Sequence, residues 1–256
     1  MTRVRSYALP VVGYAILILG WWLVAAARSG PSSPLLNPAQ LLQSTWNNRS
    51  ALYTHLNATA WEAFLGFAVG AAIALLLSVL TVRFMLLGRI IQKFALVLYS
   101  LPLIAIAPLM VIWFGAGLRT KVIIAALAAF FPVLVNTTEA LLATSRQALE
   151  LMQVMGASFT TTSWRVRLPY ALPAMFASFT IAAPAAVIGA TVAEWVGGDR
   201  GLGVAILAAM QSYNVPLLWS SILVVSLLSL VAYGVFAVLG RVLFPWHESV
   251  SNAGES

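Results

Sequence analysis

The sequence predicts an all-α integral membrane protein with about six transmembrane helices. Of its 256 residues, 61% are hydrophobic and only 8% are charged, whereas a soluble domain carries about 25% charged residues. Uncharged apolar runs recur at about the 20 residues that a helix needs to cross the hydrocarbon core of a bilayer. Within a single domain of residues 1–256, the predicted spans lie near residues 7–27, 63–82, 94–118, 122–138, 174–193 and 217–240.

The first apolar run follows Arg3 and Arg5, and residues 25–27 are three alanines. A charged start and a small-residue cleavage site are also typical of a secretory signal peptide. The run is longer than the roughly 7–15 apolar residues of a signal peptide, which favours a retained helix. The outer segment that follows contains proline-rich loop sequence and then a short interfacial helix over residues 40–56.

Small residues recur at every fourth position of the second span, at Gly66, Gly70, Ala74 and Ser78. This spacing predicts a face that packs closely against another helix.

The third span contains Pro102 and Pro108, and proline removes a backbone hydrogen bond and kinks a helix. Helix breaks of this kind line the pathway in many transporters, and in other membrane proteins they are plain kinks. Both prolines are therefore pathway candidates, with the kink as the alternative.

Two acidic residues, Glu62 and Glu194, lie at the outer edges of predicted spans. An acid inside a membrane is usually functional, so an outer gate is one interpretation of Glu194. A solvated helix end, or a pair with Arg200, is the other. Glycines at residues 197–203 predict a tight turn, followed by an amphipathic helix over residues 204–212.

Basic residues predict the orientation, because they concentrate in cytoplasmic loops. With the N-terminus inside, nine basic residues face the cytoplasm and five face outward. This count places both termini, and the polar loop 139–173, in the cytoplasm. The inner set is Arg3, Arg5, Arg83, Arg89, Lys93, Arg146, Arg165, Arg167 and Arg241, and the outer set is Arg28, Arg49, Arg119, Lys121 and Arg200.

No residues with a catalytic or metal-binding spacing stand out. The chain has no cysteine, and His55 and His247 lie far apart, which suggests interfacial positions for both. A nucleotide-binding P-loop needs Gly-Lys followed by Ser or Thr. The only lysines, Lys93 and Lys121, follow glutamine and threonine. Any ATP-driven motor would therefore be a separate protein.

The polar loop 139–173 has the pattern of two short helices joined by a glycine. Thr144 and Gln147 form a candidate capping box for a helix over residues 145–155. Gly156 is placed to end that helix in a left-handed conformation, and Ser158 is placed to cap a second helix. The first helix has more apolar residues than a single buried face would use. The sequence thus favours a docking knob slightly over a loop packed on its own bundle.

The spacing of this loop resembles the EAA motif of ABC importer permeases, in which Glu-Ala-Ala precedes a glycine and then Ile-x-Leu-Pro. Here Glu150-Leu151-Met152 takes the place of the triplet, Gly156 follows, and residues 166–169 read Val-Arg-Leu-Pro. The upstream Glu139-Ala140-Leu141 has the wrong distance to Gly156. The resemblance extends from about residue 55 to residue 246 and includes Gly66-Phe67, Pro102, Pro108, Trp113-Phe114-Gly115, Phe131-Pro132, Asn136-Thr137, Glu194-Trp195 and Gly201-Leu202-Gly203.

The resemblance implies a type I ABC importer permease fold in a bacterial inner membrane. It implies two permease copies, ATPase subunits that bind ATP and Mg, an extracytoplasmic substrate-binding protein, surrounding lipid and no nucleic acid. It also implies a coupling helix that docks on the ATPase. The residues expected to take part in coupling are Glu150, Leu151, Met152, Gly156, Ala157, Ser158, Leu168 and Pro169.

Within the superfamily, the chain is most similar to permeases for nitrate, sulfonate, taurine and thiamine-precursor uptake. Leu-Met replaces Ala-Ala in the motif, which implies a differently shaped socket on the ATPase. This form, with Ile188-Gly189 and Glu194-Trp195, resembles permeases grouped with thiamine-pyrimidine and riboflavin uptake. The alternatives are a standalone secondary transporter or channel, which the scarcity of intramembrane charge disfavours, and an intramembrane enzyme, which the missing catalytic residues disfavour.

Overall fold

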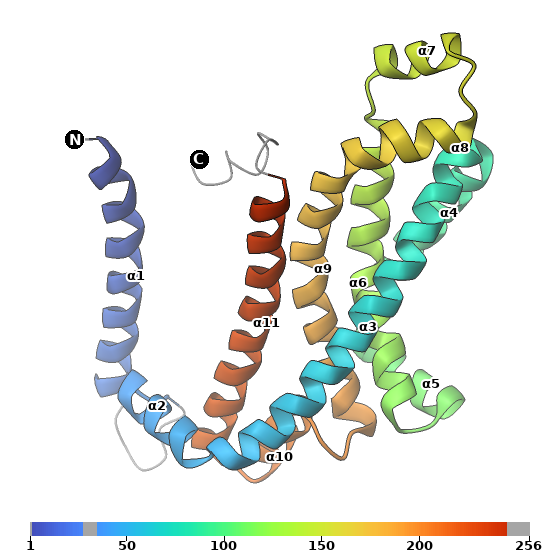
Figure 1. Ribbon diagram of the computed structural model, residues 1–256. Helices are drawn as coiled ribbons and strands as arrows, with labels where there is room; N and C mark the ends of the chain where they lie inside the picture. Colours follow the sequence, from blue (N-terminus) through green and yellow to red (C-terminus); the bar gives the residue numbers. More distant parts are fainter. Residues whose placement is uncertain (1, 28–34, 245–256) are drawn as a thin grey trace.

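The computed structural model describes residues 2–27 and 35–244, in which every regular element is a helix (Figure 1). Two helices extend beyond the predicted spans, because α3 begins well before residue 63 and the helix of the fifth span begins before residue 174. The helices are α1 (Thr2–Ala27), α2 (Pro38–Asn47), α3 (Arg49–Arg83), α4 (Met85–Ser100), α5 (Leu103–Phe114), α6 (Leu118–Leu142), α7 (Arg146–Val154), α8 (Phe159–Thr162), α9 (Leu168–Gly197), α10 (Leu202–Gln211) and α11 (Val215–Leu243), with a π-helical turn at Ser163–Arg167 before α9.

Four helical stretches are long and apolar enough to cross a bilayer: α3, α6, α11 and the continuous helix Phe159–Gly197. The pair α4 and α5 adds a fifth if it counts as one bent span. The first predicted span lies in α1, whose apolar stretch among the described residues, Ala15–Ala27, is shorter than a full crossing. By length and composition, the described residues thus contain up to five crossings where the sequence predicted six.

The predicted third span, 94–118, corresponds to the end of α4 and to α5, which are separate helices. The chain bends by 98° between α4 and α5. Pro102 stands at this bend with an extended backbone and precedes α5. Because proline disfavours a helical conformation in the residue before it, Leu101 is extended as well. Pro108 is accommodated inside α5, so only one of the two prolines breaks the chain.

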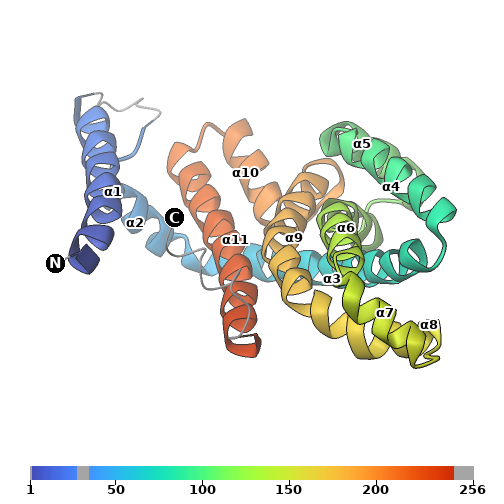
Figure 2. The ribbon, with the colours of Figure 1, turned by 90° about the horizontal axis from the view of Figure 1, so that it is seen from above.

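The core lies where α3 and α9 pack against α6 (Figure 2). It consists mainly of small side chains. Ala74 and Ala129 are fully buried in it. The predicted small-residue face of α3 is confirmed, since Gly66 and Gly70 lie against Ala125 and Ala126 of α6. Small residues let two backbones approach closely, and dispersion contacts then hold the helices together.

The remaining helices attach to this core through aromatic and polar contacts. Phe67 of α3 packs on Phe236 of α11, with ring centroids 4.9 Å apart. Helix α1 stands apart from the core and contacts α11 through stacked Trp21 and Trp219, 6.1 Å apart (Figure 1). At the end opposite α7, α2 and α10 lie beside the start of α11 (Figure 1).

Candidate functional site

Helix α7 stands beyond the ends of α6 and α9, at one pole of the molecule (Figure 1). The predicted helix over 145–155 is confirmed to within a residue at each end. The predicted capping box is wrong: Thr144 is buried and donates to the carbonyl oxygen of Leu141, 3.0 Å away. Ser145 caps α7 instead, since its hydroxyl oxygen accepts from the backbone N–H of Ala148.

Gly156 ends this segment with φ +70°, the left-handed conformation that the sequence predicted. The backbone N–H groups of Gly156 and Ala157 donate to the carbonyl oxygens of Gln153 and Met152, each at 2.9 Å. Ser158 then caps α8 by accepting from the N–H of Thr161 at 3.2 Å. The two short helices therefore meet at a sharp, internally hydrogen-bonded turn.

Helix α7 is amphipathic and exposes apolar side chains, and none of its residues is buried. Leu151 is 61% exposed, Val154 87% and Met155, which ends the helix, 70%. Glu150 pairs with Arg146 of the same helix at 2.8 Å, and both side chains are open to solvent. Exposed pairs of this spacing contribute only about 0.3–0.5 kcal/mol, so Glu150 can exchange its partner at little cost.

The predicted coupling loop 139–173 is shorter in the structure, because its second half is helical. Helix α8, the π-helical turn and α9 form one continuous helix of 39 residues, Phe159–Gly197. The N–H of Leu168 donates to the carbonyl of Ser163, a π-type bond, and Pro169 follows with no N–H to offer. Leu168 and Pro169 thus lie inside the continuous helix that follows the turn at Gly156.

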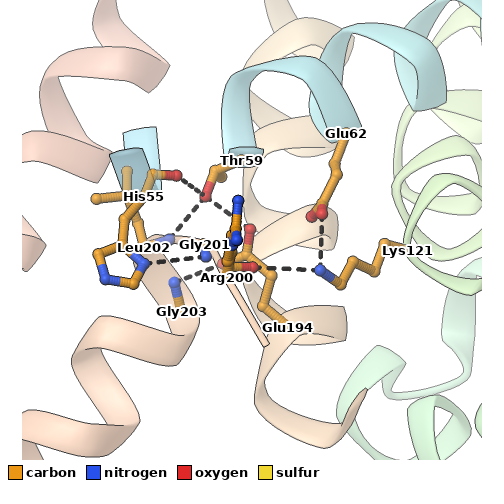
Figure 3. Close-up of polar contacts among 9 residues, drawn as sticks. All are labelled: His55, Thr59, Glu62, Lys121, Glu194, Arg200, Gly201, Leu202 and Gly203. Atoms are coloured by element: carbon orange, nitrogen blue, oxygen red, sulfur yellow. Dashed lines mark hydrogen bonds and ion pairs between the residues drawn. The ribbon is translucent and has the colours of Figure 1, made fainter. Parts of the chain in front are cut away.

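A second candidate site lies near the opposite end, where α3, α6, α9 and the start of α10 meet (Figure 3). Lys121 of α6 pairs with Glu62 of α3, with Nζ and Oε1 2.7 Å apart. Both residues are at least 95% buried. Lys121 also donates to the backbone oxygen of Arg200 at 3.2 Å. The interpretation of Glu62 as a solvated helix end is therefore wrong, and Lys121, in the first turn of α6, is buried as its partner.

Glu194 is 1% exposed and binds the turn that leads into α10 (Figure 3). Thr59 of α3 donates to its Oε1 at 2.6 Å, and the N–H of Gly203 donates to its Oε2. The alternatives of a solvated helix end and of a pair with Arg200 are both wrong, since Arg200 contributes only its backbone to this cluster. The structure leaves the gate interpretation of Glu194 as a prediction.

Three consecutive backbone N–H groups at the start of α10 have side-chain acceptors. Gly201 donates to Nδ1 of His55 at 3.1 Å, Leu202 to the hydroxyl of Thr59 at 2.8 Å, and Gly203 to Glu194. The first N–H groups of a helix lack partners within the helix, so these side chains cap α10 from α3 and α9. His55 is thus a helix-capping residue, and His247 lies outside the described residues.

Sequence reasoning found Glu62, Glu194 and Lys121 but not their association, and it missed Thr59. The residues come from segments more than 50 positions apart, so no local spacing reveals the cluster. The available signal was the small number of charged residues, because the chain has only two lysines and seven acidic residues. Buried charges in membranes are paired, which would have pointed to Glu62 and Lys121 as partners.

Pro102 and Pro108 are both exposed, and neither is part of the buried cluster. Their helix nevertheless reaches it, because Ala107 packs with Ala193, next to Glu194. Among the described residues, no group of three His, Asp or Glu side chains is arranged to hold a metal ion.

The fold and these two sites define a polytopic helical membrane protein with an exposed apolar knob at one pole and a buried polar cluster near the other. The model of the binding-protein-dependent transport system inner membrane component family matches residues 66–245. The chain belongs to this family, and the prediction of an ABC importer permease is confirmed.

Relatives and a solved structure agree with this assignment. The chain is similar to the formylaminopyrimidine transport permease protein ThiX of Halalkalibacterium halodurans, with 33% identity over 95% of this chain and 98% of the relative. It is 32% identical to the riboflavin transport system permease protein RibX of Chloroflexus aurantiacus, over 96% of both chains. A chain of the MetNI methionine ABC transporter has a TM-score of 0.61 and 22% identity, covering 77% of this chain and 96% of that chain. This likeness confirms the type I importer permease fold.

Proposed function

We propose that this permease subunit receives the motion of separate ATPase subunits through α7 and the turn at Gly156. The observation that carries the proposal is the exposed apolar face of α7, which the hydrogen-bonded turn at Gly156 joins to the continuous helix Phe159–Gly197. Contiguous exposed apolar surface marks a site for a partner protein. A continuous helix transmits displacement, so movement of the knob becomes movement of the core.

The coupling residues have distinct roles in this proposal. Glu150 forms a charge-assisted hydrogen bond to a basic residue in the ATPase groove, and Leu151 and Met152 fill the groove. Gly156, Ala157 and Ser158 shape the turn. Leu168 and Pro169 connect the knob to α9. Because Leu151 and Met152 are larger than the alanines usual in the motif, the groove of the cognate ATPase is wider.

The proposed assembly contains two copies of this chain, two ATPase subunits that bind ATP and Mg, and an extracytoplasmic binding protein. Both termini lie in the cytoplasm, with α7 on the cytoplasmic face and α10 on the outer face. The chain itself is non-catalytic and alternates between inward- and outward-facing states. Glu194, Pro102 and Pro108 belong to the outer half, where a gate would act.

The proposed substrate is a small polar or heteroaromatic solute. The relatives that are at least 32% identical over nearly the whole chain are named for formylaminopyrimidine and riboflavin, and a more distant one, at 28% identity, is named for taurine. A nitrogen heterocycle is therefore favoured over a sulfonate. The test is the affinity of the cognate binding protein for an aminopyrimidine, riboflavin and taurine, measured by calorimetry. Tight binding of taurine alone would reverse this order.

The coupling role is tested by Glu150→Lys and Gly156→Asp in the transporter reconstituted with its ATPase and binding protein. Both variants should reach the membrane in normal amounts and lose most ATP-dependent uptake. Gln147→Lys, which adds a positive charge one turn earlier on α7, is the matched control and should keep uptake. Normal uptake by both coupling variants would contradict the proposal. Uptake by the purified chain alone under an ion gradient would instead indicate a secondary transporter.

A further inference from the structure

A cavity of about 220 Å³ lies between α3, α6 and the continuous helix Phe159–Gly197. It borders the π-helical turn that connects the α7–α8 segment to α9. In α-helical proteins, single π-helical turns are frequent at functional sites. Apolar side chains make up most of the wall. The lining residues are Leu75, Val79, Val82, Leu141, Leu168 and Met175, with Phe159, Trp164, Thr137, Ser163 and Arg167.

Three polar side chains on this wall have a buried atom without a hydrogen-bond partner. They are the hydroxyls of Thr137 and Ser163 and the Nε–H of Arg167. Thr137 is 1% exposed, so water does not reach it from the surface. An unsatisfied buried polar group is costly, and native proteins seldom leave several together. The cavity therefore has the character of a binding site.

The charge at the cavity is positive. Arg167 lines it, and its Nη1 donates to the carbonyl oxygen of Leu141 at 3.2 Å. The guanidinium of Arg83 lies 4.7 Å from the ring centroid of Phe159, which is also part of the wall. The ion pairs of the described residues involve neither arginine. Arg167 thus lines an apolar cavity, Arg83 lies beside the Phe159 part of its wall, and neither has an ion-pair partner among the described residues.

We propose that this cavity holds one anionic phospholipid of the cytoplasmic leaflet. An acyl chain occupies the apolar part, and the phosphate binds Arg167 and Arg83. Basic pockets between transmembrane helices on the cytoplasmic side bind acidic headgroups. Trp164, which is 68% exposed at the wall, belongs at a membrane–water interface. The inference rests on the proposed orientation, which places this end of the bundle in the cytoplasmic leaflet.

The cavity is large enough for part of one acyl chain, since a cavity of about 150 Å³ already holds benzene. Neutral apolar ligands would leave the guanidinium groups unpaired. A soluble anion would leave the apolar wall empty. A phospholipid meets both requirements, because its acyl chain fills the apolar part and its phosphate pairs with the guanidinium groups. The bound lipid would join α3 and α6 to the helix that carries α7, and so support the connection that transmits motion.

The test is native mass spectrometry of the purified full chain with its ATPase, titrated with phosphatidylglycerol or with phosphatidylcholine of the same acyl chains. The wild-type complex should retain phosphatidylglycerol preferentially. Arg167→Gln should weaken its retention by about fivefold. Arg165→Gln removes the same charge two residues away, from an exposed side chain that does not line the cavity, and should have no effect.

A second variant tests the apolar part of the site. Ser163→Leu fills the cavity and should abolish retention of the bound lipid, while the melting temperature of the complex stays near that of the wild type. Glycerol 3-phosphate, which has the headgroup chemistry without acyl chains, should not compete. Competition by it would indicate a soluble anion instead.

Equal retention of the two lipids, or equal effects of the Arg167 and Arg165 variants, would overturn the proposal. So would unchanged retention in Ser163→Leu. These measurements use neither ATP hydrolysis nor uptake, so they stand apart from the coupling test. If the α7 variants lose uptake but retain the lipid as the wild type does, the proposal of the lipid site still stands.

Discussion

At the residue scale, Glu62 and Lys121 place opposite charges where little water reaches them. Both side chains are about 95% buried and lie 2.7 Å apart. Burying two charges is expensive, and their attraction offsets that cost only while both are present. Glu62 has a second oxygen without a hydrogen-bond partner, which makes the acid dependent on its lysine.

Lys121→Met should therefore destabilise the protein strongly, by about 3–5 kcal/mol, because it leaves Glu62 buried and unpaired. The double variant Glu62→Gln with Lys121→Met should recover much of the loss. The measurement is the thermal unfolding midpoint of the purified chain in one detergent. A double variant as unstable as Lys121→Met would show that the ion pair is not the source of the effect.

Gly201 is the second residue with a specific requirement, because it combines φ +135° with close contact to the Glu194 carboxylate. A Cβ at this position would overlap that carboxylate, and the backbone conformation is one that other residues rarely adopt. Gly201→Ala should cost about 1–3 kcal/mol and lower the unfolding midpoint. Gly117→Ala, at another interhelical turn but with nothing within 4 Å, is the control and should change the midpoint little. Equal effects would remove the role assigned to Glu194.

At the element scale, the contact between α3 and α6 depends on glycine. The position of a Cβ on Gly70 would fall 3.0 Å from Cα of Ala126, so the two helices would have to separate. Prediction from the sequence succeeded here because a repeat of small residues every fourth position has one structural meaning in a membrane helix. The sequence did not distinguish the two prolines of the third span. Only Pro102 separates two helices, whereas Pro108 lies inside α5.

Gly70→Ala should lower the thermal unfolding midpoint clearly, since the added methyl group separates α3 from α6. Gly234→Ala on α11, where nothing lies within 4 Å, is the matched substitution. It should leave stability unchanged or raise it by up to about 1 kcal/mol, because alanine favours a helix over glycine. Both effects are read from unfolding curves in the same detergent. A neutral Gly70→Ala would contradict the close packing of the two helices.

At the scale of the whole molecule, the two sites lie at opposite poles, with the core between them (Figure 1). The apolar knob precedes the continuous helix that contains α9, and the same helix carries Glu194 of the polar cluster near its end. One element thus connects the proposed ATPase contact with the outer half of the bundle. A displacement of α7 that is transmitted along this helix would move the residues of the polar cluster.

The proposed orientation can be tested by labelling, because the chain has no cysteine. Val154→Cys, at a position 87% exposed on α7, should react with a membrane-impermeant maleimide only after the cells are opened. Met210→Cys, 53% exposed on α10, should react in intact cells. Labelling is measured on the purified chain. The reverse pattern would invert the orientation and with it the assignment of the knob to the ATPase.

The sequence by itself determined the class of protein, the small-residue face of α3 and the two short helices around Gly156. These properties depend on composition and on spacings of a few residues, which are local. The tertiary structure alone decided that Glu62 pairs with Lys121 and that Thr59 and Glu194 cap α10. Those contacts join segments distant in the chain, and burial in a shared interior, which no local pattern encodes, selects the partner of each charge.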